Sequence, residues 1–199
     1  MQQHLENQLI NAFPNYLKDK VIKVISNLTD DTSYYHEYVE AFIIDNELVE
    51  IPYRFYFKNT EIKLDNLDEL EKVILYCIFS RDNDGYVREK YIQKLIELDK
   101  IYDFVIPFLF IITGEYVVEI IEISLLGIKK IEKSILEKFI EKNSEKIKLI
   151  EERMISYWSE YYRRKSFGIT FRPEYKDWSN YPAHFVLDHI KKHGYKTNR

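Results

Sequence analysis

Apolar residues recur at helical spacing along most of the chain beyond residue 65, and polar breaks divide the pattern into segments. In residues 67–126 the breaks are the DNDG turn at 82–85, the polar pair 99–100 and Gly114. Apolar positions repeated every three or four residues are typical of amphipathic helices, and Asp and Gly mark where helices begin and end. The pattern predicts helices at about 67–79 and 86–98, from about 103 to Gly114, and at 115–126, which stack as two helical hairpins. Asp65 or Asn66 is the expected cap of the first helix, and Asp84 that of the second.

The N-terminal part has a different pattern. Residues 39–57, VEAFIIDNELVEIPYRFYF, consist of two runs of β-branched and aromatic residues around Asp45 and Asn46, which predicts a β-hairpin. Pro52 cannot donate to a strand ladder, so we expect the second strand to lie at an edge or to contain a bulge. Residues 3–12 have a weak helical pattern that stops at Pro14, and residues 16–28 fit a helix or a strand, because KVIKVI satisfies both periods.

The C-terminal part begins with Lys and Glu alternating around apolar positions, from Gly127 to about residue 165. This pattern predicts one helix interrupted near Asn143 and Ser144, or two helices that meet there. After Gly168 an aromatic-rich extended segment precedes a short helix at about 182–193. We therefore predict a single domain, 1–199, with an N-terminal helix and β-hairpin part (1–64), a helical core (65–166) and an aromatic-rich C-terminal segment with a short helix (167–199).

Composition supports a folded, mainly α protein. The chain of 199 residues has 17 Tyr and 12 Phe but only 5 Gly and 5 Pro, which argues against disorder and against a β-barrel with many turns. Its net charge of −4 provides no overall field that would recruit nucleic acid or anionic lipid.

Several features predict a cytoplasmic protein without a membrane anchor. Cys77 is the single cysteine, so no internal disulfide can form, and a reducing compartment is the simplest expectation. The N-terminus lacks the pattern of a secretory signal. Glu115, Glu119 and Glu122 interrupt the long apolar run at 104–128, and carboxylates at the centre of a bilayer are costly.

The DNDG turn and the helix after it resemble the HEAT repeat, in which an acidic residue in the turn precedes a Val-Arg pair and a Leu follows along the helix. Asp82, Val87, Arg88 and Leu95 fit this spacing, whereas Tyr91 stands where HEAT repeats prefer Ala. The match covers about one repeat. It implies HEAT-like stacking of helical hairpins and no particular function.

Longer blocks are similar to those of a family of uncharacterised bacterial proteins. These blocks are LYCIFSRDNDGYVREKYIQKL, VIPFLFIITGEYVVEI and SYWSEYYRRK, with a Tyr-Pro pair at 181–182. The resemblance implies no catalytic residue and no cofactor. It groups eight residues as one candidate binding surface: Arg81, Asp84, Arg88, Glu115, Glu119, Tyr157, Trp158 and Tyr161.

The acidic residues of the fourth helix allow three interpretations. At 100° per residue, Glu115, Glu119 and Glu122 fall within an arc of about 60° on a helix that is otherwise apolar. They form a solvated stripe paired with Arg88 or Arg81, the floor of a binding groove, or a pair of carboxylates for metal or acid–base chemistry.

Two apparent metal motifs do not satisfy the geometry of a metal site. If Gly85 takes the sixth position of a calcium loop, Ser80 and Tyr91 occupy its anchoring positions, where carboxylates are needed. His189 and His193 share a helix face, but His184 points almost the opposite way, so one metal cannot use all three. We predict no metal site.

The segment from Tyr157 to Arg172 mixes aromatic and basic residues. Such a mixture can stack bases and hold phosphates, or it can pack into a core with extended arginine side chains at the surface. The chain has no Gly-rich phosphate loop and no nucleophile elbow, so an enzyme with a conventional covalent nucleophile is not expected.

These observations lead to one leading hypothesis and two alternatives. The leading hypothesis is a module that binds another protein, as a regulatory or antitoxin-like partner, through the eight-residue surface. The first alternative is a hydrolase or metal-dependent enzyme that uses Glu115 and Glu119. The weaker alternative is an RNA-binding protein.

Overall fold

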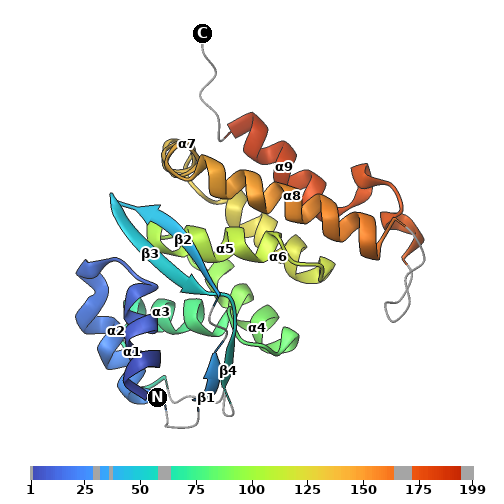
Figure 1. Ribbon diagram of the computed structural model, residues 1–199. Coiled ribbons are helices and arrows are strands. Elements are labelled where there is room, and N and C mark those ends of the chain that lie inside the picture. The colour runs from blue at the N-terminus through green and yellow to red at the C-terminus, as the bar shows by residue number, and fades with distance from the viewer. Residues whose placement is uncertain (1, 29–31, 36–37, 58–63, 164–171, 194–199) are drawn as a thin grey trace. The chain divides into compact units, whose positions relative to one another are not determined.

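The computed structural model describes residues 2–28, 32–35, 38–57, 64–163 and 172–193 (Figure 1). The fold is mainly helical, with helical hairpins and a small antiparallel β-hairpin near the N-terminus, which confirms the predicted fold class. The chain divides into two compact units, Met1–Phe108 (unit 1) and Leu109–Arg199 (unit 2). Within the described ranges, no helix is both long and apolar enough to cross a membrane.

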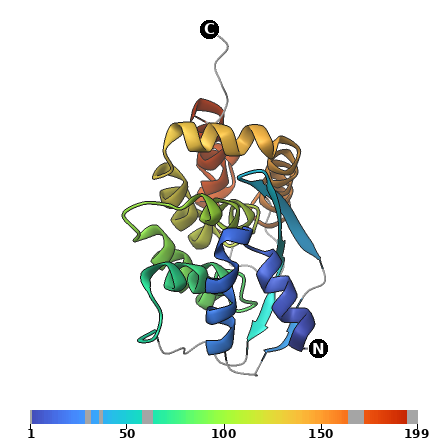
Figure 2. The same cartoon turned by 90° about the vertical axis from the view of Figure 1, so that its left-hand side faces the viewer.

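Unit 1 begins with two helices around a proline turn. Helix α1 (Gln2–Asn11) ends before Pro14, the short 3-10 helix η1 (Asn15–Leu17) follows, and α2 (Lys18–Asn27) continues from it. The KVIKVI segment is thus helical, and its Val21 and Val24 are fully buried. Figures 1 and 2 show α1 and α2 lying beside each other.

The predicted β-hairpin is confirmed. Strands β2 (Val39–Ile44) and β3 (Glu47–Pro52) pair in register from Val39↔Pro52 to Ile44↔Glu47. Asp45 and Asn46 have φ angles of 48° and 71°. A two-residue hairpin loop with both φ angles positive matches the right-handed twist of its strands, and Asp and Asn tolerate this conformation better than most residues.

A second strand pair was not predicted. The predicted second strand of the hairpin stops at Pro52, and β4 (Phe55–Phe57) pairs instead with β1 (Thr32–Tyr35). Phe55 also bonds to the DNDG turn, because its N–H donates to the carbonyl of Arg81 at 2.9 Å and its carbonyl accepts from the N–H of Asn83 at 2.8 Å. The turn therefore pairs with β4 along the edge opposite β1, through a parallel bridge between Phe55 and Asp82.

Helices α3 (Glu69–Phe79) and α4 (Gly85–Ile96) form the helical hairpin of unit 1. Asp68 caps α3, in place of the predicted Asp65 or Asn66, and forms a capping box with Glu71. Asp84 caps α4 as predicted, because its side chain accepts a hydrogen bond from the N–H of Tyr86. The Cys77 side chain is fully buried in α3.

The apolar run after residue 103 forms short, buried helices. The 3-10 helix η2 (Asp103–Val105) leads into α5 (Ile106–Thr113), whose described apolar side chains are buried on every side of the helix. The helix ends before Gly114, as predicted.

Unit 2 contains α6 (Val118–Lys129), α7 (Lys133–Lys142), α8 (Ser144–Tyr161) and α9 (Pro182–His193). The predicted Lys/Glu-rich helix is two helices that meet at Asn143, whose side chain donates to the carbonyl of Phe139 at 2.9 Å. Helix α6 packs against α9, and the 3-10 helices η3 (Pro173–Tyr175) and η4 (Trp178–Asn180) precede α9. Helix α6 starts three residues later than predicted.

Candidate binding face

The eight predicted surface residues fall into two groups. Unit 1 contains Arg81, Asp84 and Arg88, and unit 2 contains the other five: Glu115, Glu119, Tyr157, Trp158 and Tyr161.

The two arginines of unit 1 are interior residues. Arg81 is 0% exposed and Arg88 is 5% exposed. Arg81 donates to the carbonyl of Tyr53 at 2.5 Å, and its guanidinium lies 5.7 Å from the centre of that tyrosine ring. Arg88 donates to the carbonyls of Asp82 and Asn83, both at 2.9 Å. Arg88 thus holds the DNDG turn, and Arg81 ties the residue before the turn to Tyr53. Both arginines are buried in unit 1, where the sequence suggested that they line a binding surface.

The DNDG turn also contains a buried carboxylate. Asp82 is 1% exposed, and its Oδ1 accepts a hydrogen bond from the N–H of Asp84 at 2.8 Å. Burial raises the pKa of the Asp82 carboxyl above its ordinary value of 3.8. Within the ranges that the structure describes, no group of three or more His, Cys, Asp or Glu side chains could hold a metal ion.

The predicted acidic stripe of unit 2 is shorter than expected. Because α6 begins at Val118, Glu115 precedes the helix, and its side chain is buried at 3% exposure. Glu119 forms a salt bridge with Arg172, and Glu122 accepts a hydrogen bond from the hydroxyl of Tyr175 at 3.1 Å. The partner of Glu119 is thus Arg172, whereas one of the three interpretations of the stripe paired it with Arg88 or Arg81. The hydrogen bond to Glu119 raises the pKa of the Arg172 guanidinium.

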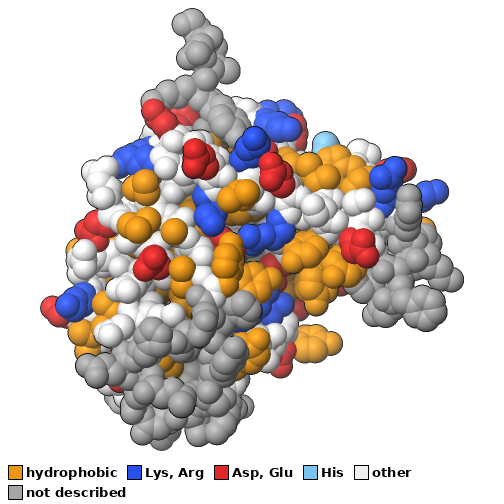
Figure 3. Space-filling model, viewed as in Figure 1, with side chains coloured by type: hydrophobic (Ala, Val, Ile, Leu, Met, Phe, Trp, Pro, Cys, Tyr) orange, Lys and Arg blue, Asp and Glu red, His pale blue; other side chains and the backbone are white. Residues whose placement is uncertain are grey.

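Beside this stripe, three tyrosine rings form a continuous patch, which we call the tyrosine face: Tyr116, Tyr157 and Tyr161. The centre of the Tyr116 ring lies 6.0 Å from that of Tyr157 and 5.0 Å from that of Tyr161. The ring centres of Tyr157 and Tyr161 are 5.7 Å apart. Tyr116 is 43% exposed and the other two are half-buried. Figure 3 shows hydrophobic side chains gathered over α6 and α8.

Trp158 contacts the segment before α9. Its indole N–H donates to the carbonyl of Tyr175 at 2.9 Å, and its ring meets Trp178 edge-on at 5.5 Å. The Arg163 guanidinium lies 5.8 Å from the centre of the Trp158 ring.

Tyr162 joins the tyrosine face to the same segment. Its hydroxyl donates to the carbonyl of Tyr116 at 2.5 Å, and its ring packs against Tyr175 and Tyr181, with centres 5.9 Å and 5.0 Å away. Burial raises the pKa of Tyr162 to about 12. Sequence reasoning missed Tyr116 and Tyr175, although the abundance of tyrosine was a visible signal.

The structure adds no support for RNA contact by residues 157–172 or for a metal site at the three histidines near the C-terminus. Residues 164–171 of the proposed RNA-contacting segment lie outside the described residues, and Arg172 beyond them is paired with Glu119. The ring of His184 lies against Trp178 at 5.8 Å, while His189 and His193 are 4.7 Å apart. Burial is the main cause that lowers the pKa of His189.

Unit 1 also has an open groove of about 400 Å³ along the outer side of α4. Its lining residues recur at intervals of three and four: Tyr86, Glu89, Lys90, Gln93, Lys94 and Glu97. They mix both signs of charge, which is typical of a solvated helix face.

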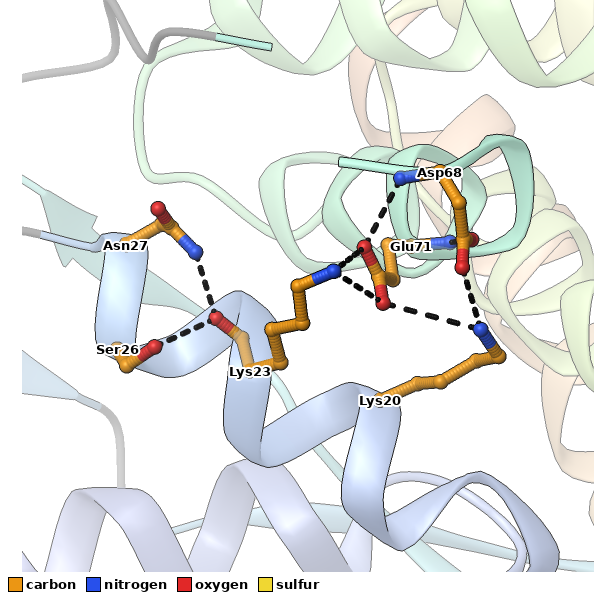
Figure 4. Close-up of polar contacts among 6 residues, drawn as sticks. All are labelled: Lys20, Lys23, Ser26, Asn27, Asp68 and Glu71. Carbon is orange, nitrogen blue, oxygen red and sulfur yellow. Dashed lines mark hydrogen bonds and ion pairs between the residues drawn. The ribbon is translucent and has the colours of Figure 1, made fainter. Parts of the chain in front are cut away.

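A polar cluster joins α2 to the start of α3 (Figure 4). Lys23 donates to both carboxylate oxygens of Glu71, at 2.9 Å and 2.7 Å, and Lys20 lies 2.5 Å from Asp68 and 3.7 Å from Glu71. The Lys20 contact is the main cause that lowers the pKa of Asp68 to about 2. Each of the four groups is matched by opposite charge within the cluster, so it stabilises unit 1 and does not present a free charge to a ligand.

Comparisons with protein-family models, with curated proteins and with solved structures give no match for this chain.

Proposed function

We propose that this chain is a protein-binding or regulatory module of the cytoplasm, and that its partner contacts the tyrosine face of unit 2. The observation that carries the proposal is the tyrosine face itself: three rings in mutual contact, of which Tyr116 is 43% exposed. The location is supported by the single cysteine, which is buried.

Tyrosine is suited to binding a protein because its ring supplies apolar contact area and its hydroxyl supplies a hydrogen bond. Interfaces are enriched in tyrosine, and a few such residues at the centre of an interface provide most of the binding free energy. Its side chain also has few rotatable bonds, so little conformational entropy is lost when it is immobilised.

The carboxylates of Glu119 and Glu122 on α6 would help to orient a partner that contacts the tyrosine face. The side chain of Glu119 is 43% exposed and Glu122 is exposed, and both already accept hydrogen bonds from side chains of their own chain. Polar groups at the rim of an interface affect orientation and association rate more than affinity. A partner with complementary cationic and amide groups fits this arrangement.

The experiment is affinity capture from the native lysate with the wild-type chain and with Tyr157→Ala/Tyr161→Ala as bait. We expect the double variant to lose the captured protein, with an affinity at least about 30-fold weaker, because truncating central aromatic residues typically costs about 2 kcal/mol or more. Binding is then measured with the purified partner by calorimetry.

The matched control is Tyr86→Ala, which removes an 85% exposed tyrosine from unit 1 and should leave capture unchanged. Reversal of the exposed Glu122 to Lys tests the rim, whereas Glu115 is unsuitable because a lysine there would bury a charge. Equal recovery of the partner by the wild type and the tyrosine double variant would refute the proposed face.

A further inference from the structure

Residues 172–180, which we call the strap, follow the surface of unit 2 between α8 and α9. We propose that the strap occupies, within its own chain, a receptor site for a partner segment of the same chemistry: an arginine followed three residues later by a tyrosine. The inference rests on the proposed function, because it names the kind of segment that the binding face takes.

Polar contacts attach the strap to α6 and α8. Arg172 is paired with Glu119, and the Tyr175 hydroxyl donates to Glu122 at 3.1 Å. The two carboxylates lie three residues apart on α6, and the arginine and tyrosine lie three residues apart on the strap. The indole N–H of Trp158 completes the attachment by donating to the Tyr175 carbonyl at 2.9 Å.

Aromatic side chains provide the apolar part of the attachment. Tyr175 meets Tyr162 edge-on at 5.9 Å, and Trp178 meets Trp158 edge-on at 5.5 Å. Because the Tyr162 hydroxyl is bonded to the Tyr116 carbonyl, the strap adjoins the tyrosine face. A segment that replaced the strap would therefore lie beside the tyrosine face.

The strap is held less firmly than the helix that follows it. Six of the eight residues at 173–180 are exposed, and only Tyr175 and Trp178 are half-buried. In α9, by contrast, Ala183, Val186 and Ile190 are all fully buried. Segments with few buried apolar groups and exposed hydrogen bonds open at the lowest free energy, and exposed ion pairs such as Arg172 with Glu119 add little stability.

These contacts are of the kind that bind peptides between proteins. Arginine and tyrosine are the residues most enriched, together with tryptophan, among those that dominate interface binding energy. An arginine held by a carboxylate also gives directional hydrogen bonds. The contacts of Arg172 with Glu119 and of Tyr175 with Glu122 thus indicate how the site would recognise the arginine and the tyrosine of a partner segment.

The test uses a synthetic peptide of the strap, RPEYKDWSN, added to the wild-type chain and to Arg172→Ala/Tyr175→Ala. We expect the peptide to bind the double variant at least about tenfold more tightly, because in the wild type the tethered strap competes at an effective concentration of the order of mM. Equal binding to both chains, or no binding to the variant, would overturn the proposal.

Tryptophan fluorescence measures strap opening independently. The chain has two tryptophans, and the Trp158–Trp178 contact places both at the strap. The double variant should shift their emission to longer wavelength with an unchanged helical circular dichroism spectrum, whereas the control Lys176→Ala/Asn180→Ala, at exposed strap positions, should not. If the double variant does not fold, Glu119→Gln/Glu122→Gln weakens the same contacts from α6, and an unshifted emission there would contradict the proposal.

The outcomes separate this inference from the proposed function. Peptide binding without any captured partner would support the receptor site and count against the tyrosine face as a partner site. A partner captured equally by the wild type and the strap variant would retain the proposed function and overturn the strap as an occupant. Association of the double variant with added wild-type chain, whose strap keeps Arg172 and Tyr175, would show that the strap of a second copy fills the site, which would overturn a separate partner segment.

Discussion

At the scale of single residues, the DNDG turn shows how buried charge fixes a loop. Arg88 donates to two carbonyls of the turn, and Asp82 accepts from the N–H of Asp84 inside it. An arginine offers several donors in a fixed plane, so one side chain can satisfy adjacent carbonyls that no regular element reaches. The turn is therefore a rigid support for both α4 and β4.

The buried carboxylate of Asp82 leads to a prediction about pH. Its pKa is raised by burial, so the folded state binds this proton more tightly than the unfolded state. The stability that this contributes is fully present below the unfolded pKa, ordinarily 3.8, and is lost as the pH rises through the raised folded value. Asp82→Asn, which does not titrate, should therefore be more destabilising at pH 4 than at pH 7.

Urea unfolding at the two pH values measures this difference. Asp84→Asn is the control, because asparagine also caps helices and the Asp84 side chain lies at the helix start instead of in the interior. A free-energy difference between the wild type and Asp82→Asn that is independent of pH would contradict the prediction.

Sequence could predict the role of Asp84 but not that of Arg81. Helix capping depends on neighbours two or three residues away, so local chemistry suffices to identify the cap. Arg81 bonds to the carbonyl of Tyr53, 28 residues earlier in the chain. That partner depends on how β4 meets the turn, and no local pattern records it. The same reason explains why Arg172 was not recognised as the partner of Glu119.

At the scale of elements, the contact between α2 and α3 includes a cluster of ion pairs. Lys20 and Lys23 of α2 contact Asp68 and Glu71 at the start of α3 (Figure 4). Carboxylates at a helix N-terminus are also favoured by the helix dipole. The Lys23 hydrogen bond is the largest cause that lowers the pKa of Glu71 below its ordinary value of 4.5.

We predict that Glu71→Gln lowers the free energy of unfolding by about 1 kcal/mol at pH 7, because glutamine keeps the capping bond but loses the ion pairs. A depressed carboxyl pKa contributes stability that is present above the unfolded value of 4.5 and lost as the pH falls through the folded value. The difference between variant and wild type should thus shrink below pH 4.5. Denaturant unfolding at pH 7, 5 and 3 measures it.

Glu69→Gln is the matched control, because Glu69 is 87% exposed and pairs with Lys72 within the same helix. It should change stability less than Glu71→Gln at every pH. A larger effect at Glu69 would show that charge at the helix start, and not the contact with α2, is what matters.

Elements with strong local signals were predicted well, and those that depend on distant partners were not. The β2–β3 turn, the N-cap of α4 and the start of α9 follow from Asp, Asn and Pro at fixed offsets. Strands β1 and β4 have four and three residues; they pair with each other, and β4 also bonds to the turn. Helix α6 begins at Val118 after an extended Val117, and helical periodicity alone did not reveal this start.

At the scale of the whole molecule, each compact unit contains fully buried apolar side chains. Ile74 of α3 and Ile147 of α8 are both 0% exposed, one in each unit. We predict that Ile74→Ala and Ile147→Ala each cost about 2–5 kcal/mol, as expected for cavities left by large apolar side chains. Because each cavity lies within one unit, native-state hydrogen exchange should accelerate mainly in the unit that carries the substitution.

The same measurement tests the single domain predicted from the sequence. If both substitutions accelerate exchange equally in both units, the chain unfolds as one cooperative body and the single-domain prediction holds. The conservative variants Ile74→Val and Ile147→Val serve as controls, with an expected cost of about 0.5–1.5 kcal/mol.

The complete burial of Cys77 has a practical consequence for such experiments. It is the sole thiol of the chain and lies in unit 1, where burial raises its pKa well above the ordinary value of 9.0. A thiol reagent reacts only with an accessible thiolate, so labelling of Cys77 reports the opening of unit 1. Both tryptophans lie in unit 2. The native sequence thus carries one intrinsic reporter for each unit, and the two can be followed in one sample without any engineered label.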